Sequence, residues 1–100
     1  MSKIRTLERK RFSILTADLQ HCYICTRPKQ HLHEVFYGKN RKNSMIYGCV
    51  VPLCYECHEG NRGVHKNSTL NEQLRKQCQR QFNKEYPDLD FISIFHENYL

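Results

Sequence analysis

The sequence predicts a small α+β domain braced by a zinc ion, with a helical segment at its C-terminal end. The chain has 100 residues, which is enough for a single hydrophobic core. Two Cys-x-x-Cys pairs, Cys22/Cys25 and Cys54/Cys57, enclose a stretch rich in β-forming residues. Apolar residues with helical spacing recur in the last third. We therefore expect one domain with a basic arm over 1–11, a zinc-braced core over 12–66 and a helical extension over 67–100.

The first half of the chain predicts short strands separated by polar turns. Residues 1–11 are basic and weakly patterned, so they form an arm or the first turn of a helix. Residues 12–16 and 31–37 are rich in β-forming side chains, and the second segment alternates. A basic polar loop over 38–44 follows. Residues 47–53 predict a strand that pairs with 31–37 across this loop.

The second half of the chain predicts helices. A short helix begins within residues 54–57 and ends at Gly60 or Gly63. A longer helix follows, with Ser68 or Thr69 as its N-cap. One apolar stripe along it is formed by Leu70, Leu74, Cys78 and Phe82. Residues 91–95 predict a second, shorter apolar helix or turn that covers the core.

The whole chain has a formal net charge of +6, and its basic residues gather in the first part of the sequence. Residues 1–42 hold ten Lys/Arg against three Asp/Glu. This asymmetry favours an anionic partner, with nucleic acid as the default and solubility alone as the alternative. No apolar stretch approaches the roughly 20 residues that a membrane span needs, and no apolar signal core follows the charged first residues. We expect no membrane partner, no export and a cytoplasmic location.

The six cysteines favour a metal over disulfides, because a reducing cytoplasm disfavours structural disulfides. Zinc takes four tetrahedral ligands, and each Cys-x-x-Cys pair supplies two of them. The expected ligands of one structural zinc are Cys22, Cys25, Cys54 and Cys57. Cys49 and Cys78 are expected to be small buried apolar residues. Residues 54–58 also spell the c-type haem attachment pattern, which would leave the first pair unexplained.

A group of histidines lies around the cysteine pairs. His33 and Glu34 on a strand, opposite His58 at a helix start, form a donor set for a second, divalent metal. His65 follows His58 by two helical turns, so it would share a face with His58 if the helix continued past the glycines. In the alternative interpretation these histidines only line the surface near the zinc.

Several of these segments resemble an HNH endonuclease, and more narrowly the small HNH-type proteins of bacterial prophages. The segments that carry the resemblance are His33-Glu34-Val35-Phe36, the 38–44 loop, 47–54, and Cys57-His58 with Gly63-Val64-His65. The resemblance covers about residues 12–66, and more loosely the tail. It implies a ββα-metal fold and metal-assisted hydrolysis of a DNA phosphodiester bond, by nicking or by cleaving.

The resemblance also implies roles for individual residues around one catalytic divalent metal (Mg, Mn, Ni or Zn). His33 takes the position of a metal ligand and Glu34 that of the general base, where the family usually has histidine. In the alternative register His33 is the base, and Glu34 and His58 hold the metal. His58 matches the last histidine of the family name, and His65 is a further expected ligand.

The middle asparagine of the family pattern is replaced here by Cys49. Asn40 or Asn43 from the 38–44 loop is expected to orient the base instead. Basic residues near the site are expected to hold DNA phosphates without reading sequence. They are Lys39, Arg41, Lys42, Arg62 and Lys66.

Two rival functions accompany the nuclease prediction. The first is a catalytically inactive zinc-dependent DNA-binding module, which the departures at Glu34 and Cys49 favour. The second is a protein-interaction zinc domain, in which Tyr23, Tyr37 and Tyr55 meet a partner. The prophage resemblance points to a bacterial or phage-infected cell and to a phage protein as a partner. The oligomeric state stays open.

Overall fold

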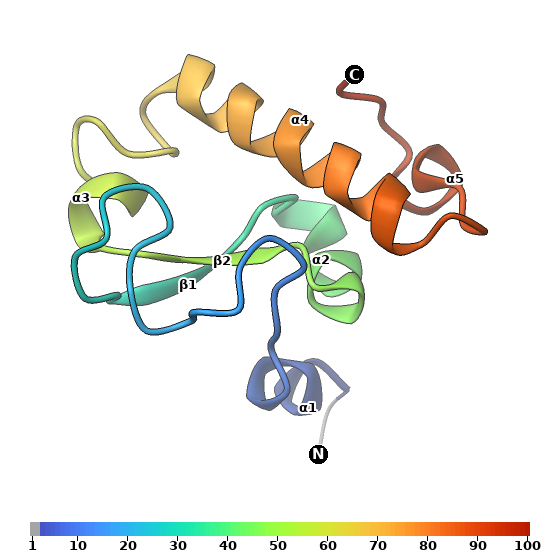
Figure 1. Ribbon diagram of the computed structural model, residues 1–100, viewed down its shortest axis with the longest axis horizontal. Helices are drawn as coiled ribbons and strands as arrows, with labels where there is room; N and C mark the ends of the chain where they lie inside the picture. The colour runs from blue at the N-terminus through green and yellow to red at the C-terminus, as the bar shows by residue number, and fades with distance from the viewer. Residues whose placement is uncertain (1–2) are drawn as a thin grey trace.

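The computed structural model describes the backbone of residues 3–100 and the side chains of residues 5–100. It is a small α+β domain with one two-stranded sheet and several helices (Figure 1). In chain order the elements are α1 (Lys3–Arg9), β1 (His31–Glu34), the 3-10 helix η1 (Gly38–Asn40), α2 (Arg41–Tyr47), β2 (Val50–Leu53), α3 (Tyr55–His58), α4 (Ser68–Glu85) and α5 (Phe91–Phe95). The predicted arm is thus mostly a helix, and its residues 1–2 lie outside the described part.

The two strands form an antiparallel hairpin, as the sequence predicts. His31 pairs with Leu53 and His33 pairs with Val51. Both strands are shorter than expected, because the chain bends after Glu34 and β2 begins only at Val50. Since side chains alternate along a strand, His31 and His33 lie on one face of β1.

The expected basic loop over 38–44 is wrong, because this segment is helical. η1 runs directly into α2, which buries Ser44 and Met45. The Ser44 hydroxyl donates to the Phe36 carbonyl oxygen at 2.7 Å and accepts from the Phe36 amide at 3.2 Å. Gly48 ends α2 in the left-handed conformation, with φ of 76°. The polar composition of 38–44 gave no sign that Ser44 would be buried, and the glycine that ends the helix, Gly48, lies beyond this segment.

The expected strand over 12–16 is also wrong. This segment has no strand partner apart from one bond, in which the Ile14 amide donates to the Gly48 carbonyl oxygen at 2.9 Å. The Ser13 hydroxyl accepts from the amides of Leu15 and Thr16, which turns the chain. The Phe12 ring packs against Gly48 so closely that a Cβ on this glycine would lie 2.5 Å from it.

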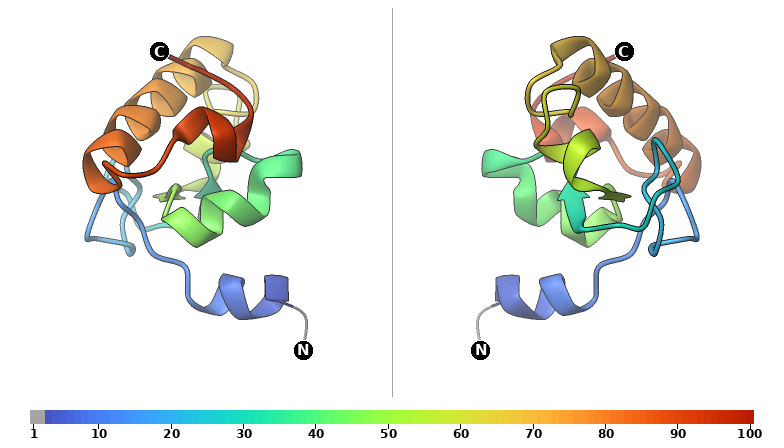
Figure 2. Two further views of the ribbon diagram at one scale, coloured as in Figure 1. Left: turned by 90° about the vertical axis from the view of Figure 1, so that its right-hand side faces the viewer. Right: turned by 90° about the vertical axis from the view of Figure 1, so that its left-hand side faces the viewer.

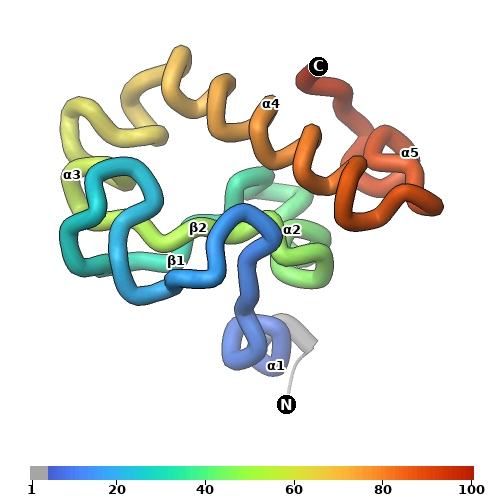
Figure 3. The backbone as a smooth tube through the Cα atoms, in the orientation of Figure 1, coloured from blue at the N-terminus to red at the C-terminus, as the bar shows by residue number. Residues whose placement is uncertain are grey.

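The long helix α4 provides one wall of the core, and the longer helix that the sequence predicts in the last third of the chain is confirmed. Leu74, Cys78 and Phe82 are buried against the hairpin and α5. The N-cap is Asn67, not Ser68 or Thr69, and its side chain accepts from the Leu70 amide at 3.0 Å. Figure 2 shows α4 along one side of the hairpin and α1 on the opposite side. The tube of Figure 3 shows α5 beside the C-terminal end of α4. No helix within residues 3–100 is long and apolar enough to cross a membrane.

Candidate metal centres

The four predicted cysteines come together at one end of the hairpin. One sulfur from each of Cys22, Cys25, Cys54 and Cys57 lies within 4.8 Å of the others. The Sγ atoms of Cys25 and Cys54 are 3.5 Å apart, and none of the cysteines in residues 5–100 forms a disulfide. This four-cysteine cluster is therefore geometrically compatible with a structural metal such as zinc.

Backbone hydrogen bonds hold the first cysteine pair beside the second. The Thr26 amide donates to the Cys22 carbonyl oxygen at 2.9 Å and closes the turn. The Tyr23 amide donates to the Pro52 carbonyl oxygen at 2.8 Å, which fixes this turn to β2. Cys54 follows β2 directly and begins α3, so the hairpin end presents all four sulfurs to one point.

Two thiols of the four-cysteine cluster, those of Cys22 and Cys57, have pKa values shifted in opposite directions. Burial raises the pKa of Cys22, but backbone amides, first that of Cys54, outweigh it and lower the pKa to about 7. Burial, together with hydrogen bonds from the other thiols, raises the pKa of Cys57. Cys22 thus ionises more readily than Cys57, and a bound cation would favour the thiolate form of both.

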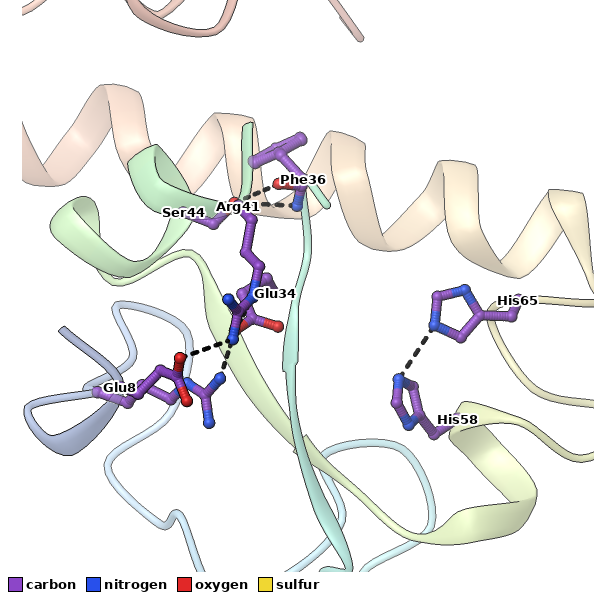
Figure 4. A network of polar contacts seen from close by, with 8 residues as sticks. Glu8, Glu34, Phe36, Arg41, Ser44, His58 and His65 are labelled. Atoms are coloured by element: carbon purple, nitrogen blue, oxygen red, sulfur yellow. Dashed lines mark hydrogen bonds and ion pairs between the residues drawn. The ribbon is translucent and has the colours of Figure 1, made fainter. Parts of the chain in front are cut away.

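A second cluster lies on the face of β1 that carries His33. One ring nitrogen from each of His33, His58 and His65 lies within 4.8 Å of the others. The Nε2 atoms of His58 and His65 are 3.1 Å apart, and a dashed line marks this contact in Figure 4. These side chains come from β1, from the last residue of α3 and from the loop after α3. We call them the three-histidine cluster.

A chain reversal brings His65 to His58, not a continued helix. α3 ends at His58, and the following loop folds back on it. The Val64 amide donates to the Cys57 carbonyl oxygen at 2.9 Å, and the His65 amide donates to that of His58 at 3.3 Å. A Cβ on Gly63 would lie 2.7 Å from the His58 carbonyl group, so only glycine permits this approach.

His33 is the buried member of the three-histidine cluster. Its side chain is 2% exposed, and its Nε2 atom has no hydrogen-bond partner among residues 5–100. Burial lowers the pKa of His33 to about 3, with smaller contributions from the charges of His58, His65 and Arg75. Burial also lowers the pKa of His58. Neutral imidazoles with free lone pairs suit Zn²⁺, Ni²⁺ and related ions, and three protein ligands leave further positions open.

Glu34 does not join the three-histidine cluster. Its carboxylate accepts a hydrogen bond from Arg11 at 2.6 Å and pairs with the Arg41 Nε at 3.3 Å. Arg41 also pairs with Glu8 of α1 at 3.3 Å. Figure 4 shows Glu34 on one side of β1, with His58 and His65 on the other. The structure therefore does not bring Glu34 and His58 together as ligands of one metal, and Glu34 instead ties the arm to α2.

The two candidate asparagines point to the C-terminal segment. The Asn40 side-chain amide donates to the Phe95 carbonyl oxygen at 3.0 Å, and that of Asn43 to the Ile94 carbonyl oxygen at 3.1 Å. Both acceptors belong to α5, so both amides hold this helix. Neither is in the three-histidine cluster.

The expected phosphate-binding residues differ in whether an acidic side chain pairs with them. Lys39, Lys42, Arg62 and Lys66 are exposed, whereas Arg41 is ion-paired. A hollow of about 460 Å³ lies beside the four-cysteine cluster. It is lined by Cys25, Arg27, Glu56, Cys57 and Arg62. Arg27 is thus a further basic residue near Arg62 that the sequence prediction omitted.

Three residues around the three-histidine cluster received no metal-site role from the sequence. His31 Nδ1 lies 3.1 Å from His58 Nδ1. The Tyr37 ring lies 4.9 Å from the His65 ring, and the Arg75 guanidinium lies 4.8 Å from the Tyr37 ring centre. The period of two along β1 could have indicated His31. Nothing local could have indicated Arg75, which α4 brings in from far along the chain.

No family model, curated protein or solved structure matches this chain.

Proposed function

We propose that this protein is a metal-dependent DNA endonuclease of the HNH type, which nicks or cleaves DNA by hydrolysing phosphodiester bonds. The observation that carries the proposal is the convergence of His33, His58 and His65 from a strand, a helix and a loop. The order of β1, β2 and α3 around these residues supports the ββα-metal arrangement that the sequence resemblance implies.

In this proposal the two clusters have different tasks. The four-cysteine cluster holds one structural zinc, which stabilises the hairpin end. Binding of a structural zinc contributes about 10–16 kcal/mol to the folding of small zinc domains, and a chain of this size has a small core. The three-histidine cluster holds the catalytic divalent ion. The proximity of two different donor sets supports a division into a closed structural site and an open catalytic site.

The residues of this chain would orient the substrate at the three-histidine cluster. A divalent ion bound there supplies charge stabilisation for the phosphodiester oxygens. The low pKa of His33 keeps its ring neutral, so its lone pair stays free for the ion. The exposed cations Lys39 and Lys42 lie in η1 and α2, after β1, and are free to bind flanking phosphates.

The second candidate function is a DNA-binding module without catalysis. The position of Glu34 favours it, because this carboxylate is paired with Arg11 and Arg41 on the far side of β1. In the HNH assignment Glu34 is the general base, and a base must reach the water that it activates. The two functions agree on metal and DNA binding and differ in hydrolysis.

A plasmid-nicking assay tests the proposal. Zinc-loaded protein is incubated with supercoiled plasmid and Mg²⁺, Mn²⁺ or Ni²⁺. We expect metal-dependent relaxation that His33→Ala and His65→Ala both abolish. His65 is exposed, so its replacement keeps the test valid if the buried His33→Ala variant fails to fold. His96→Asn, at an exposed residue outside both clusters, is the matched control and should nick normally. DNA binding without relaxation under any metal would establish the second candidate.

A pair of variants separates the two roles of Glu34. If Glu34 only holds Arg11 and Arg41, Glu34→Gln and Arg11→Gln both lower stability and retain the nicking rate, and Glu34→Gln lowers stability more because it also loses the pair with Arg41. If Glu34 is the base, Glu34→Gln loses nicking and Arg11→Gln keeps it. Thermal unfolding and nicking of the same samples decide between them.

A further inference from the structure

Among the residues around the three-histidine cluster, His31 has the shortest contact that the proposed function leaves unused. Its Nδ1 atom lies 3.1 Å from the Nδ1 atom of His58, and the two ring centres are 4.9 Å apart. His31 occupies the same face of β1 as His33. His58 is thus contacted from both sides, by His31 at Nδ1 and by His65 at Nε2.

The geometry of these contacts limits how the ring of His58 can be protonated when a metal is bound at its Nε2 atom. Its Nε2 faces the cluster, so a metal bound there needs the Nε2 lone pair. A neutral imidazole then carries its proton on Nδ1, and this N–H requires an acceptor. The Nδ1 atom of His31 is within hydrogen-bond distance and can accept it.

The backbone holds His31 in place for this contact. His31 pairs with Leu53 in the hairpin, and the preceding Gln30 amide donates to the Leu53 carbonyl oxygen at 3.0 Å. The Gln30 side chain accepts from the Tyr55 amide at 2.6 Å, at the first residue of α3. The start of β1 is therefore fixed to the helix that carries His58.

We infer that His31 is a positioning residue of the three-histidine metal site, which accepts the Nδ1 proton of His58 and so directs the Nε2 lone pair to the metal. The inference rests on the metal site of the proposed function. Partners of this kind fix the tautomer and orientation of a ligating histidine, and their loss weakens metal binding by about 10–100-fold. His31 itself does not bind the metal.

The test is a titration of zinc-loaded protein with Ni²⁺, followed by calorimetry. In His31→Phe the acceptor is missing, and we expect the Ni²⁺ affinity to fall by about 10–100-fold. In His31→Gln a side-chain oxygen can accept the proton, so most of the affinity should return. His96→Asn, which replaces an exposed histidine outside the cluster, should bind Ni²⁺ as the unaltered protein does. Circular dichroism checks that every variant is folded.

A spectroscopic readout separates positioning from a general effect on the fold. In protein loaded with a diamagnetic ion, NMR of the histidine ring nitrogens should report a protonated Nδ1 and a metal-bound Nε2 on His58. In His31→Phe this Nδ1 proton should exchange faster with water, with the four-cysteine signals unchanged.

Three results would overturn the inference. Equal Ni²⁺ affinity of His31→Phe and the unaltered protein would remove the role of His31 and leave the proposed metal site intact. A loss in His31→Gln as large as in His31→Phe would make His31 a metal ligand instead. Absence of Ni²⁺ binding to the unaltered protein would overturn the inference together with the proposed catalytic site.

Discussion

Cys57 and His58 are consecutive residues of α3, yet their side chains belong to different clusters. The Cys57 sulfur lies with the other thiols, and a ring nitrogen of His58 lies with those of His33 and His65. Successive residues of a helix point about 100° apart, so one turn can serve two sites. The position of the three-histidine cluster therefore depends on the four-cysteine cluster, which fixes the first turn of α3.

Removal of the proposed structural zinc should disrupt both clusters. Without a cation the four close thiols hold the first cysteine turn to α3 only weakly, so the domain should lose most of its thermal stability. We expect a strong chelator or Cys54→Ser to abolish cooperative unfolding in circular dichroism and to abolish Ni²⁺ binding. Cys49→Ala is the matched control, because Cys49 is buried outside the cluster and its variant should keep one zinc per chain. A zinc-free protein that melts normally would contradict this dependence.

Replacement of Gly63 by alanine should separate His65 from His58. The added Cβ would lie 2.7 Å from the His58 carbonyl group, so the loop must move away from α3. We expect Gly63→Ala to retain zinc and to bind Ni²⁺ at least about 10-fold more weakly. Loss of a residue that supports a metal ligand weakens binding by this amount or more, and here a ligand itself is displaced. Calorimetry measures the loss. Gly38→Ala, where no atom lies within 4 Å of the new Cβ but φ is +72°, controls for strain alone. Equal Ni²⁺ affinity in both variants would show that the loop approach is unimportant.

Charges on η1 and α2 should contribute unequally to DNA binding. Lys39 and Lys42 are exposed and pair with no acidic group among residues 5–100, whereas Arg41 is held by Glu34 and Glu8. The double variant Lys39→Gln/Lys42→Gln should reduce the slope of log affinity against log salt by about 2. Arg41→Gln should leave this slope nearly unchanged and lower the melting temperature. Fluorescence anisotropy at several salt concentrations measures the slopes, and equal slopes for all proteins would exclude these phosphate contacts.

Replacement of Asn40 should affect stability more than catalysis. Its buried amide donates to the Phe95 carbonyl oxygen, and Asn40→Ala would leave this acceptor without its partner. We expect a loss of about 1–3 kcal/mol in the free energy of unfolding, with the single-turnover nicking rate of folded protein unchanged. Asn83→Ala, on the exposed side of α4, should change neither quantity. If Asn40→Ala has normal stability but does not nick DNA, Asn40 has the catalytic role that the sequence predicts.

The Tyr86 phenol should stabilise the protein less as the pH rises. Its hydroxyl donates to the Tyr47 carbonyl oxygen at 3.0 Å, and burial raises its pKa. The folded state therefore keeps the neutral phenol where the unfolded chain ionises, near pH of about 10. This contribution is complete below that pH and is lost as pH rises through the folded pKa. Tyr86→Phe should cost about 1 kcal/mol at neutral pH and less in alkaline urea unfolding. A cost that grows with pH would contradict this sign.

The residues that sequence analysis placed correctly carry strong local patterns. The spacing of two Cys-x-x-Cys pairs predicts the four-cysteine cluster, because each pair forms one tight turn with two sulfurs. The repeat of Leu74, Cys78 and Phe82 predicts the buried face of α4, because their spacing matches the helical period. Segments without such a period, such as α2, were misassigned, since their helix depends on burial of Ser44 and Met45 by distant elements.

The sequence by itself determined which donor atoms this chain offers, where its hairpin pairs and where its long helix runs. Only the tertiary structure decided which donors meet. In the folded chain Glu34 pairs with Arg11 and Arg41. The side chains of Asn40 and Asn43 donate to α5, and His65 contacts His58. The physical reason is that local periodicity reports the face of an element. Contacts between elements depend on strand twist, loop reversals and close backbone approach, which one-dimensional spacing does not encode.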